Sequence, residues 1–150
     1  MKRLICYNKH KLSSYSIKNC KIHNKLHFHI NVRLHSVYDG DTIKVIYYNK
    51  QIEEPVIVSC RLKGIDTPEI KQICKNKTGE NYKCGVKAKL ELINLISQQK
   101  IKCLIHGKDR YKRLIGTCFI NETNINKWLV KNGWALAYRK YSKDYIGDEE

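Results

Sequence analysis

The sequence predicts an α+β fold that is mainly β, a five-stranded OB-type Greek-key barrel with two helices. Three observations lead to this prediction. Three segments between residues 27 and 66 alternate apolar and polar residues, a helical period follows at 85–99, and two more strand-like segments precede a second helical one. The order of three strands, helix, two strands, helix is typical of such a barrel. A length of 150 residues suits one domain with one core.

The first three strands are expected at 27–37, 42–48 and 56–65, the last ending at Asp66. The segments "DGD" and "DTPE" are turns, and Pro68 fixes φ in the second. On the first strand, one face carries Phe28, Ile30, Val32 and Leu34, with Val37 as a further candidate.

Residues 71–83 are predicted to be a polar, lysine-rich loop. Strands follow at 101–105 and 113–120, and "ETNINKWLVKN" is a second helix closed by Gly133. The first helix, 85–99, has an apolar face formed by Val86, Leu90, Ile93 and Ile96, widened by Leu92 and Leu95. Trp128 and Trp134 fit core positions better than exposed stacking platforms.

Residues 1–25 are interpreted as a basic, disordered arm, and 26–150 as the folded domain. Four histidines and Cys20 gather near this boundary, but a second cysteine pair and an apolar frame for a zinc finger are missing. The charged start resembles a signal peptide, yet polar residues interrupt the apolar region that such a peptide needs.

The chain is strongly basic, with 29 Lys plus Arg, 14 Asp plus Glu, a formal net charge of +15 and a pI near 9.5. Such a balance favours a polyanionic partner. No stretch approaches the length of a membrane span, so nucleic acid is a better candidate than lipid. A generically soluble basic surface would have the same charge.

Seven cysteines leave two interpretations open. Cys103 and Cys118 flank a predicted hairpin, and Cys74 and Cys84 close a short polar loop. As disulfides, both pairs would indicate an oxidising compartment. As thiols, Cys103 and Cys118 would be small buried apolar residues, whereas Cys74 and Cys84 in a hydrophilic loop are harder to explain and favour export.

Carboxylates cluster in the two turns despite the basic composition. Asp41 follows one strand-ending turn, and Asp66 and Glu69 lie at the end of the third strand. If strands two and three pair, both turns approach one mouth of the barrel. Carboxylates with a carbonyl suit a hard cation such as Ca²⁺ or Mg²⁺. Asp-Gly-Asp alone is weak support, because both residue types are ordinary in turns.

Arginines accompany these acids. Arg61 shares a strand with Asp66, and Arg110 and Arg113 bracket Tyr111. Guanidinium groups bind phosphate oxygens through paired hydrogen bonds, and phosphodiester cleavage needs neutralised phosphoryl oxygens and an activated water. Taken singly, each arginine is better explained without a functional role: Arg61 by a structural salt bridge and Arg113 by solvation.

Together, these motifs resemble the staphylococcal nuclease (thermonuclease) family over roughly residues 27–145. They are "DGDT" at 39–42, Arg61, "DTPE" at 66–69, Asp109-x-Tyr111-x-Arg113, and "NKWLVKNGWALAYRKYSKDY" at 126–145.

The resemblance implies a secreted or periplasmic-type, Ca²⁺-dependent and monomeric nuclease. It would cut DNA and RNA with little sequence preference and leave 3′-phosphates. Asp41, Asp66 and the Thr67 carbonyl would hold calcium, Arg61 and Arg113 would clamp the phosphate, and Glu69 would orient or deprotonate the water. Arg110, Tyr111 and Tyr138 would contact substrate, and Asp39 would touch no ion directly.

Two departures from the family pattern stand out. Lys112 replaces a frequent glycine, which costs about 1 kcal/mol if that turn needs a positive φ. The chain also stops at "KDYIGDEE", where the family continues into a C-terminal helix. Two alternatives stay open: a non-catalytic nucleic-acid-binding or truncated, inactive module, and a non-enzymatic secreted basic protein stapled by disulfides.

Overall fold

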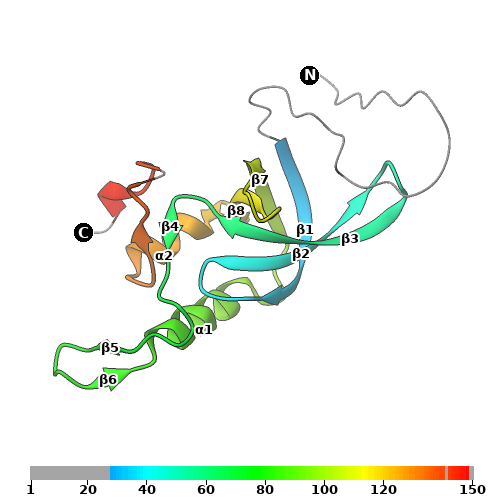
Figure 1. Cartoon of the computed structure of the whole chain (residues 1–150). Helices are drawn as coiled ribbons and strands as arrows, with labels where there is room; N and C mark the ends of the chain where they lie inside the picture. Colours follow the sequence, from blue (N-terminus) through cyan, green and yellow to red (C-terminus); the bar gives the residue numbers. More distant parts are fainter. Residues whose placement is uncertain (1–27, 141, 149–150) are drawn as a thin grey trace.

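A computed structural model describes residues 28–140 and 142–148 of the chain (Figure 1). Its main sheet has the strand order β3-β2-β1-β7-β8-β9, and β3 also pairs with β8. That pairing closes five strands into a barrel and confirms the predicted OB-type architecture. The strands are β1 (Phe28–Val37), β2 (Thr42–Asn49), β3 (Glu54–Leu62), β7 (Ile101–Lys108) and β8 (Leu114–Ile120), with β9 (Thr123–Asn124) at the end.

The closure between β3 and β8 is parallel, whereas the other ladders of the barrel are antiparallel. Cys60, Arg61 and Leu62 lie opposite Leu114, Ile115 and Gly116. The arginine of the third strand is therefore fixed against the strand that immediately follows the loop containing Arg113.

A β-bulge in β1 explains why Val37 belongs to the core. The register of β1 against β2 shifts between Leu34 and Ser36. This shift returns Val37 to the face of Val32, and both are buried. Alternation alone would have placed Val37 on the outer face.

The predicted third strand is two strands, which corrects the continuous segment expected up to Asp66. A turn at Lys63 and Gly64, the latter with φ +77°, separates β3 from β4 (Ile65–Asp66). β4 pairs with β10 (Leu136–Ala137), so that Asp66 lies opposite Leu136. The break turns Asp66 away from the barrel ladder and towards the chain that follows the second helix.

The expected polar loop at 71–83 also contains structure. β5 (Cys74–Lys75) and β6 (Asn81–Tyr82) form a small antiparallel hairpin that projects beside the first helix (Figure 1). A disulfide joins Cys74 to Cys84, with 5.6 Å between their Cα atoms. The disulfide therefore links the hairpin covalently to the start of α1.

Both predicted helices are present, with one correction to the buried face. α1 (Cys84–Ile96) buries Ala88, Leu92 and Ile96, while Leu90 is half exposed, because the face is centred on positions four residues apart. α2 (Ile125–Lys131) is capped by the Asn124 side chain, which accepts a hydrogen bond from Lys127 N. Gly133 follows it with φ +73°, as expected for a C′ glycine.

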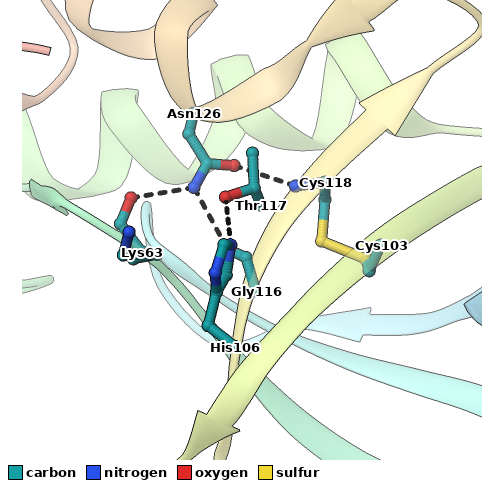
Figure 2. Close-up of a disulfide and its surroundings, with 7 residues drawn as sticks. All are labelled: Lys63, Cys103, His106, Gly116, Thr117, Cys118 and Asn126. Atoms are coloured by element: carbon teal, nitrogen blue, oxygen red, sulfur yellow. Dashed lines mark hydrogen bonds between the residues drawn. A yellow bond between two sulfur atoms is a disulfide. The ribbon is translucent and has the colours of Figure 1, made fainter. Parts of the chain in front are cut away.

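A buried amide on α2 joins the helix, β8 and the turn after β3 (Figure 2). Asn126 is 0% exposed; its Nδ2 donates to the carbonyls of Lys63 and Gly116, and its Oδ1 accepts from Cys118 N. The second disulfide, Cys103–Cys118, spans directly opposed positions of β7 and β8. The free thiol of Cys60 is buried beside it, and burial raises its pKa to about 12.

The segment 142–148 lies against the barrel and ends in the 3₁₀ turn η2 (Ile146–Asp148). Tyr145 packs into the core, and Lys63 and Lys127 form ion pairs with Asp144 and Asp148. The predicted basic arm, 1–25, lies outside the described residues, and the domain division at that point stays a prediction. Among the residues described, no helix has the length and apolar character to cross a bilayer.

Candidate functional site

The turn before β2 presents Asp41 to the "DTPE" turn. Asp39 Oδ1 accepts a hydrogen bond from Asp41 N at 3.1 Å, and this local bond shapes the turn. Asp41 Oδ2 then accepts from both Thr67 N (2.9 Å) and Thr67 Oγ1 (3.0 Å). Gly40 is required for this approach, because a Cβ there would lie 2.7 Å from Thr67 Oγ1. The two acidic turns, 26 residues apart in sequence, are thus locked together.

Arg61 bridges the two predicted metal-binding carboxylates. Its Nη1 lies 3.0 Å from Asp41 Oδ2, and its Nη2 lies 3.1 Å from Asp66 Oδ1. Asp41 is buried at 5% exposure, whereas the Asp66 side chain is 57% exposed and open to solvent. The positive charge of the guanidinium is placed where two negative charges meet.

The buried position of Asp41 makes its ionisation costly. Burial raises the pKa of Asp41 from 3.8 to about 6, and the neighbouring Asp39 charge acts in the same direction. Arg61 and the hydrogen bonds from Thr67 oppose that rise without cancelling it. A further positive charge at this carboxylate would relieve the remaining penalty.

The second arginine is held by its own loop. Asp109 Oδ2 accepts from Arg113 Nε at 2.7 Å, and Asp109 Oδ1 accepts from the backbone N of both Tyr111 and Arg113. Although burial acts to raise it, these bonds lower the pKa of Asp109 below its ordinary value, which keeps the carboxylate ionised. Lys112 has φ +65°, so the condition under which a lysine at this turn costs stability is met.

Glu69 is exposed, and its backbone is held from two sides. Gln72 N donates to the Glu69 carbonyl at 2.8 Å, and Glu69 N donates to Gln72 Oε1 at 3.2 Å. From the other side, α1 begins so close that a Cβ on Gly85 would overlap the Glu69 carbonyl oxygen. Only glycine fits at that position.

These side chains surround one polar cavity of about 190 Å³. Six of the nine predicted site residues line it, together with Asp39 and Pro68: Asp41, Arg61, Asp66, Thr67, Glu69 and Arg113. The other three do not line it. Arg110 and Arg113 both lie over the ring of the exposed Tyr111, at 4.8 and 5.5 Å from its centroid, and Tyr138 lies beyond Leu136 on the following segment.

The donor set fits a hard divalent cation. Two carboxylates from separate turns and a residue with a main-chain carbonyl, Thr67, line the same cavity, and all three offer oxygen ligands. One of those carboxylates, Asp41, has a pKa that burial raises to about 6, and a bound cation would favour its ionised form. Asp66 is accessible to an ion that retains part of its water shell.

Several residues that build the site were not predicted as site residues, although Gly40 and Asp109 lie within the motifs that carry the family resemblance. Gly40 and Gly85 act by allowing close approach, which spacing does not reveal. Gln72 and Asp109 act by orienting Glu69 and Arg113. Asp109 had a weak signal, since an Asp two residues before a tyrosine and four before an arginine is suited to a turn.

Comparison with known proteins adds a family match. The sequence profile described as staphylococcal nuclease homologue matches residues 59–150, which include Arg61, Asp66, Glu69 and Arg113. Asp41 lies before the matched region, so its place in the site depends on the geometry given above.

Three curated relatives are similar over much of the chain. The succinoglycan biosynthesis protein ExoI of Rhizobium meliloti is 34% identical over 67% of this chain and 49% of its own length. An uncharacterized endonuclease of Haemophilus influenzae is 35% identical over 76% of this chain and 56% of its own. The micrococcal nuclease of Shigella flexneri is 32% identical over 71% and 58%. The chain thus spans about half the length of these relatives.

Proposed function

Because the chain belongs to the staphylococcal nuclease homologue family, we propose that it is a metal-dependent nuclease that hydrolyses phosphodiester bonds. The observation that carries this proposal is the cavity in which Arg61 and Arg113 meet Asp41, Asp66 and Glu69. Two guanidinium groups and several carboxylates around one polar cavity match the needs of phosphoryl transfer better than those of simple nucleic-acid binding.

Asp41, Asp66 and the Thr67 carbonyl would hold the metal, for which Ca²⁺ is our proposal. Bound there, the ion would neutralise negative charge on the phosphoryl oxygens and lower the pKa of a bound water. The exposed carboxyl of Asp66 and the buried carboxyl of Asp41 would give one accessible and one fixed ligand.

The arginines would bind the scissile phosphate. Asp109 holds Arg113 by its Nε, so the two terminal nitrogens of that guanidinium stay available for phosphate oxygens. Arg61 uses Nη1 and Nη2 on the carboxylates in this structure. A bound phosphate would therefore compete with Asp41 and Asp66 for Arg61, and the metal would compensate those carboxylates when Arg61 turns to the substrate.

Glu69 would take a proton from the attacking water. The water forms a bond to phosphorus, the bond to the 5′ oxygen breaks, and that oxygen is protonated by solvent, which leaves a 3′-phosphate. An exposed glutamate at the cavity rim can reach a water without being buried itself. DNA and RNA are both proposed substrates, because nothing in these residues reads a base or a 2′-hydroxyl.

The test is cleavage of labelled single-stranded DNA and RNA by the purified chain in Ca²⁺ and in chelator. Cleavage only with the metal, 3′-phosphate ends, and a loss of at least about a hundredfold in Glu69→Gln, Arg61→Ala and Arg113→Ala are expected. Lys44→Gln, an exposed change on β2, is the matched control. Full activity in Glu69→Gln/Arg61→Ala would overturn the proposal, and retarded but uncut strands would indicate a binding module instead.

We further propose that the protein works as a monomer in an oxidising compartment. The two disulfides support the oxidising compartment, because such bonds persist outside the reducing cytosol. Alkylation of the unfolded protein without reductant should leave at least four of the seven cysteines unmodified. Modification of all seven would argue against the compartment.

A further inference from the structure

A second groove lies beside the β5–β6 hairpin, outside the residues of the polar cavity. Three lysines, an asparagine and two aromatic rings line a space of about 380 Å³: Lys75, Asn76, Lys77, Tyr82, Lys87 and Trp134. Its lining joins the hairpin, the first turn of α1 and the segment after α2. It combines cationic side chains with aromatic faces.

The hairpin that carries two of the lysines is built to hold its shape. Asn76 Oδ1 accepts hydrogen bonds from Thr78 N (3.0 Å) and Glu80 N (2.9 Å), and its Nδ2 donates to Glu80 Oε2 at 2.9 Å. Gly79 supplies the positive φ that the tip needs. The Cys74–Cys84 disulfide closes the base. Lys75 and Lys77 therefore lie on a hairpin of defined shape. Among the described residues, Glu80 is the one acidic side chain that takes part in these hydrogen bonds.

The aromatic side of the groove is partly open to solvent. Lys87 Nζ lies 5.3 Å from the centroid of the Tyr82 ring, which places its positive charge over an aromatic face. Trp134 is half-buried: it packs against the core, as predicted, and also lines the groove. One indole face can thus be fixed by packing while the side chain still reaches the groove.

The segment containing Trp134 leads to the polar cavity. Along residues 135–138, Ala135 and Ala137 are buried, whereas Leu136 is 69% and Tyr138 is 36% exposed. Leu136 pairs with Asp66, which lines the cavity. The hairpin is also joined to the cavity, since it begins five residues after Glu69. Two separate stretches of chain therefore connect the groove with the cavity.

We propose that this groove binds single-stranded nucleic acid beyond the scissile phosphate, with phosphates on Lys75, Lys77 and Lys87 and a base on Trp134. The proposal rests on the proposed nuclease function. Lysines with an interposed aromatic ring are the usual way to hold an unpaired strand without reading its sequence. A single strand is favoured over a duplex, because bases stacked inside a duplex cannot lie on an indole.

Binding is tested in chelator, so that no cleavage is needed. The affinity of the chain for a trinucleotide and for a 16-mer is measured against salt for Lys75→Gln/Lys77→Gln/Lys87→Gln. The matched control, Lys44→Gln/Lys100→Gln/Lys102→Gln, removes the same charge from exposed positions outside both sites.

For the 16-mer, the groove variant should lose at least about tenfold in affinity, and the slope of log binding constant against log salt concentration should fall by about 2. For the trinucleotide, both changes should be much smaller. The control should lose little for either. Equal losses in the two triple variants, or equal losses for short and long strands, would overturn the proposal.

Tryptophan fluorescence gives a second readout. The chain has two tryptophans, so Trp128→Phe leaves Trp134 as the sole emitter and Trp134→Phe leaves Trp128. The 16-mer should quench the first protein strongly and the second weakly, while a duplex of equal length should quench neither strongly. Equal quenching of both proteins, or stronger quenching by the duplex, would contradict stacking on Trp134.

The two proposals fail in different ways. If the chain binds and is quenched by the 16-mer but cuts nothing in Ca²⁺, the nuclease function fails and the groove stands. If the chain cuts the trinucleotide and the 16-mer at the same rate, and the groove variant changes neither the ratio of these rates nor the ratio of the two affinities, the groove proposal fails. The nuclease function then stands. Binding of an acidic peptide in preference to the 16-mer would also refute the groove proposal.

Discussion

Asp41 is the residue at which function and stability conflict. The fold buries a carboxylate and raises its pKa to about 6, so the ionised form is disfavoured in the native state. An unfolded aspartate ionises near 3.8. Between these values the native protein binds a proton that the unfolded chain has released, and the stability of the metal-free protein therefore falls as the pH rises from about 4 to 6.

Asp41→Asn should therefore stabilise the metal-free protein at neutral pH by about 3 kcal/mol and have little effect below pH 4. Urea unfolding in chelator at several pH values measures this difference. Asp144→Asn is the control of opposite sign, because hydrogen bonding from Lys63 lowers the pKa of Asp144 and its charge favours folding. A stability gain from Asp41→Asn that does not change with pH would contradict the explanation.

Lys112 shows the cost of a side chain at a positive φ. With φ +65°, Lys112→Gly should raise the free energy of unfolding by about 1 kcal/mol, while Lys108→Gly, within β7, should lower it. Denaturant titrations of both variants give the comparison. Destabilisation by Lys112→Gly would mean that the lysine makes a compensating contact.

The residues of the site were predictable as far as their chemistry shows in spacing. Asp41, Asp66 and Glu69 stand out because acids are rare in this chain and these three fall in turns. Gly40 and Gly85 were not predictable as site residues, since their role depends on a backbone from another part of the chain. Arg61 was placed correctly, but its bridge between Asp41 and Asp66 depends on a side-chain conformation that spacing does not determine.

At the scale of elements, period-2 alternation located the barrel strands and helical spacing located α1 and α2. Alternation did not locate the break between β3 and β4, because the turn takes only Lys63 and Gly64 between the apolar Leu62 and Ile65. The β5–β6 hairpin gives no strand signal in the sequence, since its strands are two residues long and mostly polar. Helical spacing alone places Leu90 in the core, because over a few turns it does not determine where the centre of the apolar face lies.

The Cys74–Cys84 disulfide links the hairpin to the turn of Glu69. Cys84 starts the helix whose Gly85 packs on the Glu69 carbonyl, and its Sγ lies 3.5 Å from the Gln72 carbonyl oxygen. Cys74→Ser/Cys84→Ser should therefore lower kcat several-fold more than KM changes, because the loop that orients the proposed base loosens.

Cys103→Ser/Cys118→Ser is the matched control for that experiment. Its disulfide joins β7 to β8 across 15 residues of chain, and its loss should cost about 3 kcal/mol of stability. Assayed well below its melting temperature, this variant should keep its kcat. Equal kcat losses in the two variants would show that the effect is general destabilisation.

The whole chain carries a formal charge of +15, and folding brings the charged residues of the described part of the chain closer together. Repulsion among like charges opposes compaction, and salt screens it over about 10 Å at 0.1 M. The melting temperature of the metal-free protein should thus rise between 10 and 200 mM NaCl. Calorimetry of the protein with acetylated lysines serves as a control, in which the rise of the melting temperature with salt should be smaller. A melting temperature of the unmodified protein that falls with salt would contradict charge repulsion as the cause.

The parallel contact of β3 with β8 has a consequence for synthesis. Ribosomes deliver residues 39–69 well before 101–120, yet the strand bearing Arg61 acquires its final neighbour only when Ile115 arrives, beside the loop of Arg113. A nascent chain therefore cannot assemble a cutting centre from its early turns alone. The strand topology itself would delay the proposed nuclease activity until translation has passed the second hairpin.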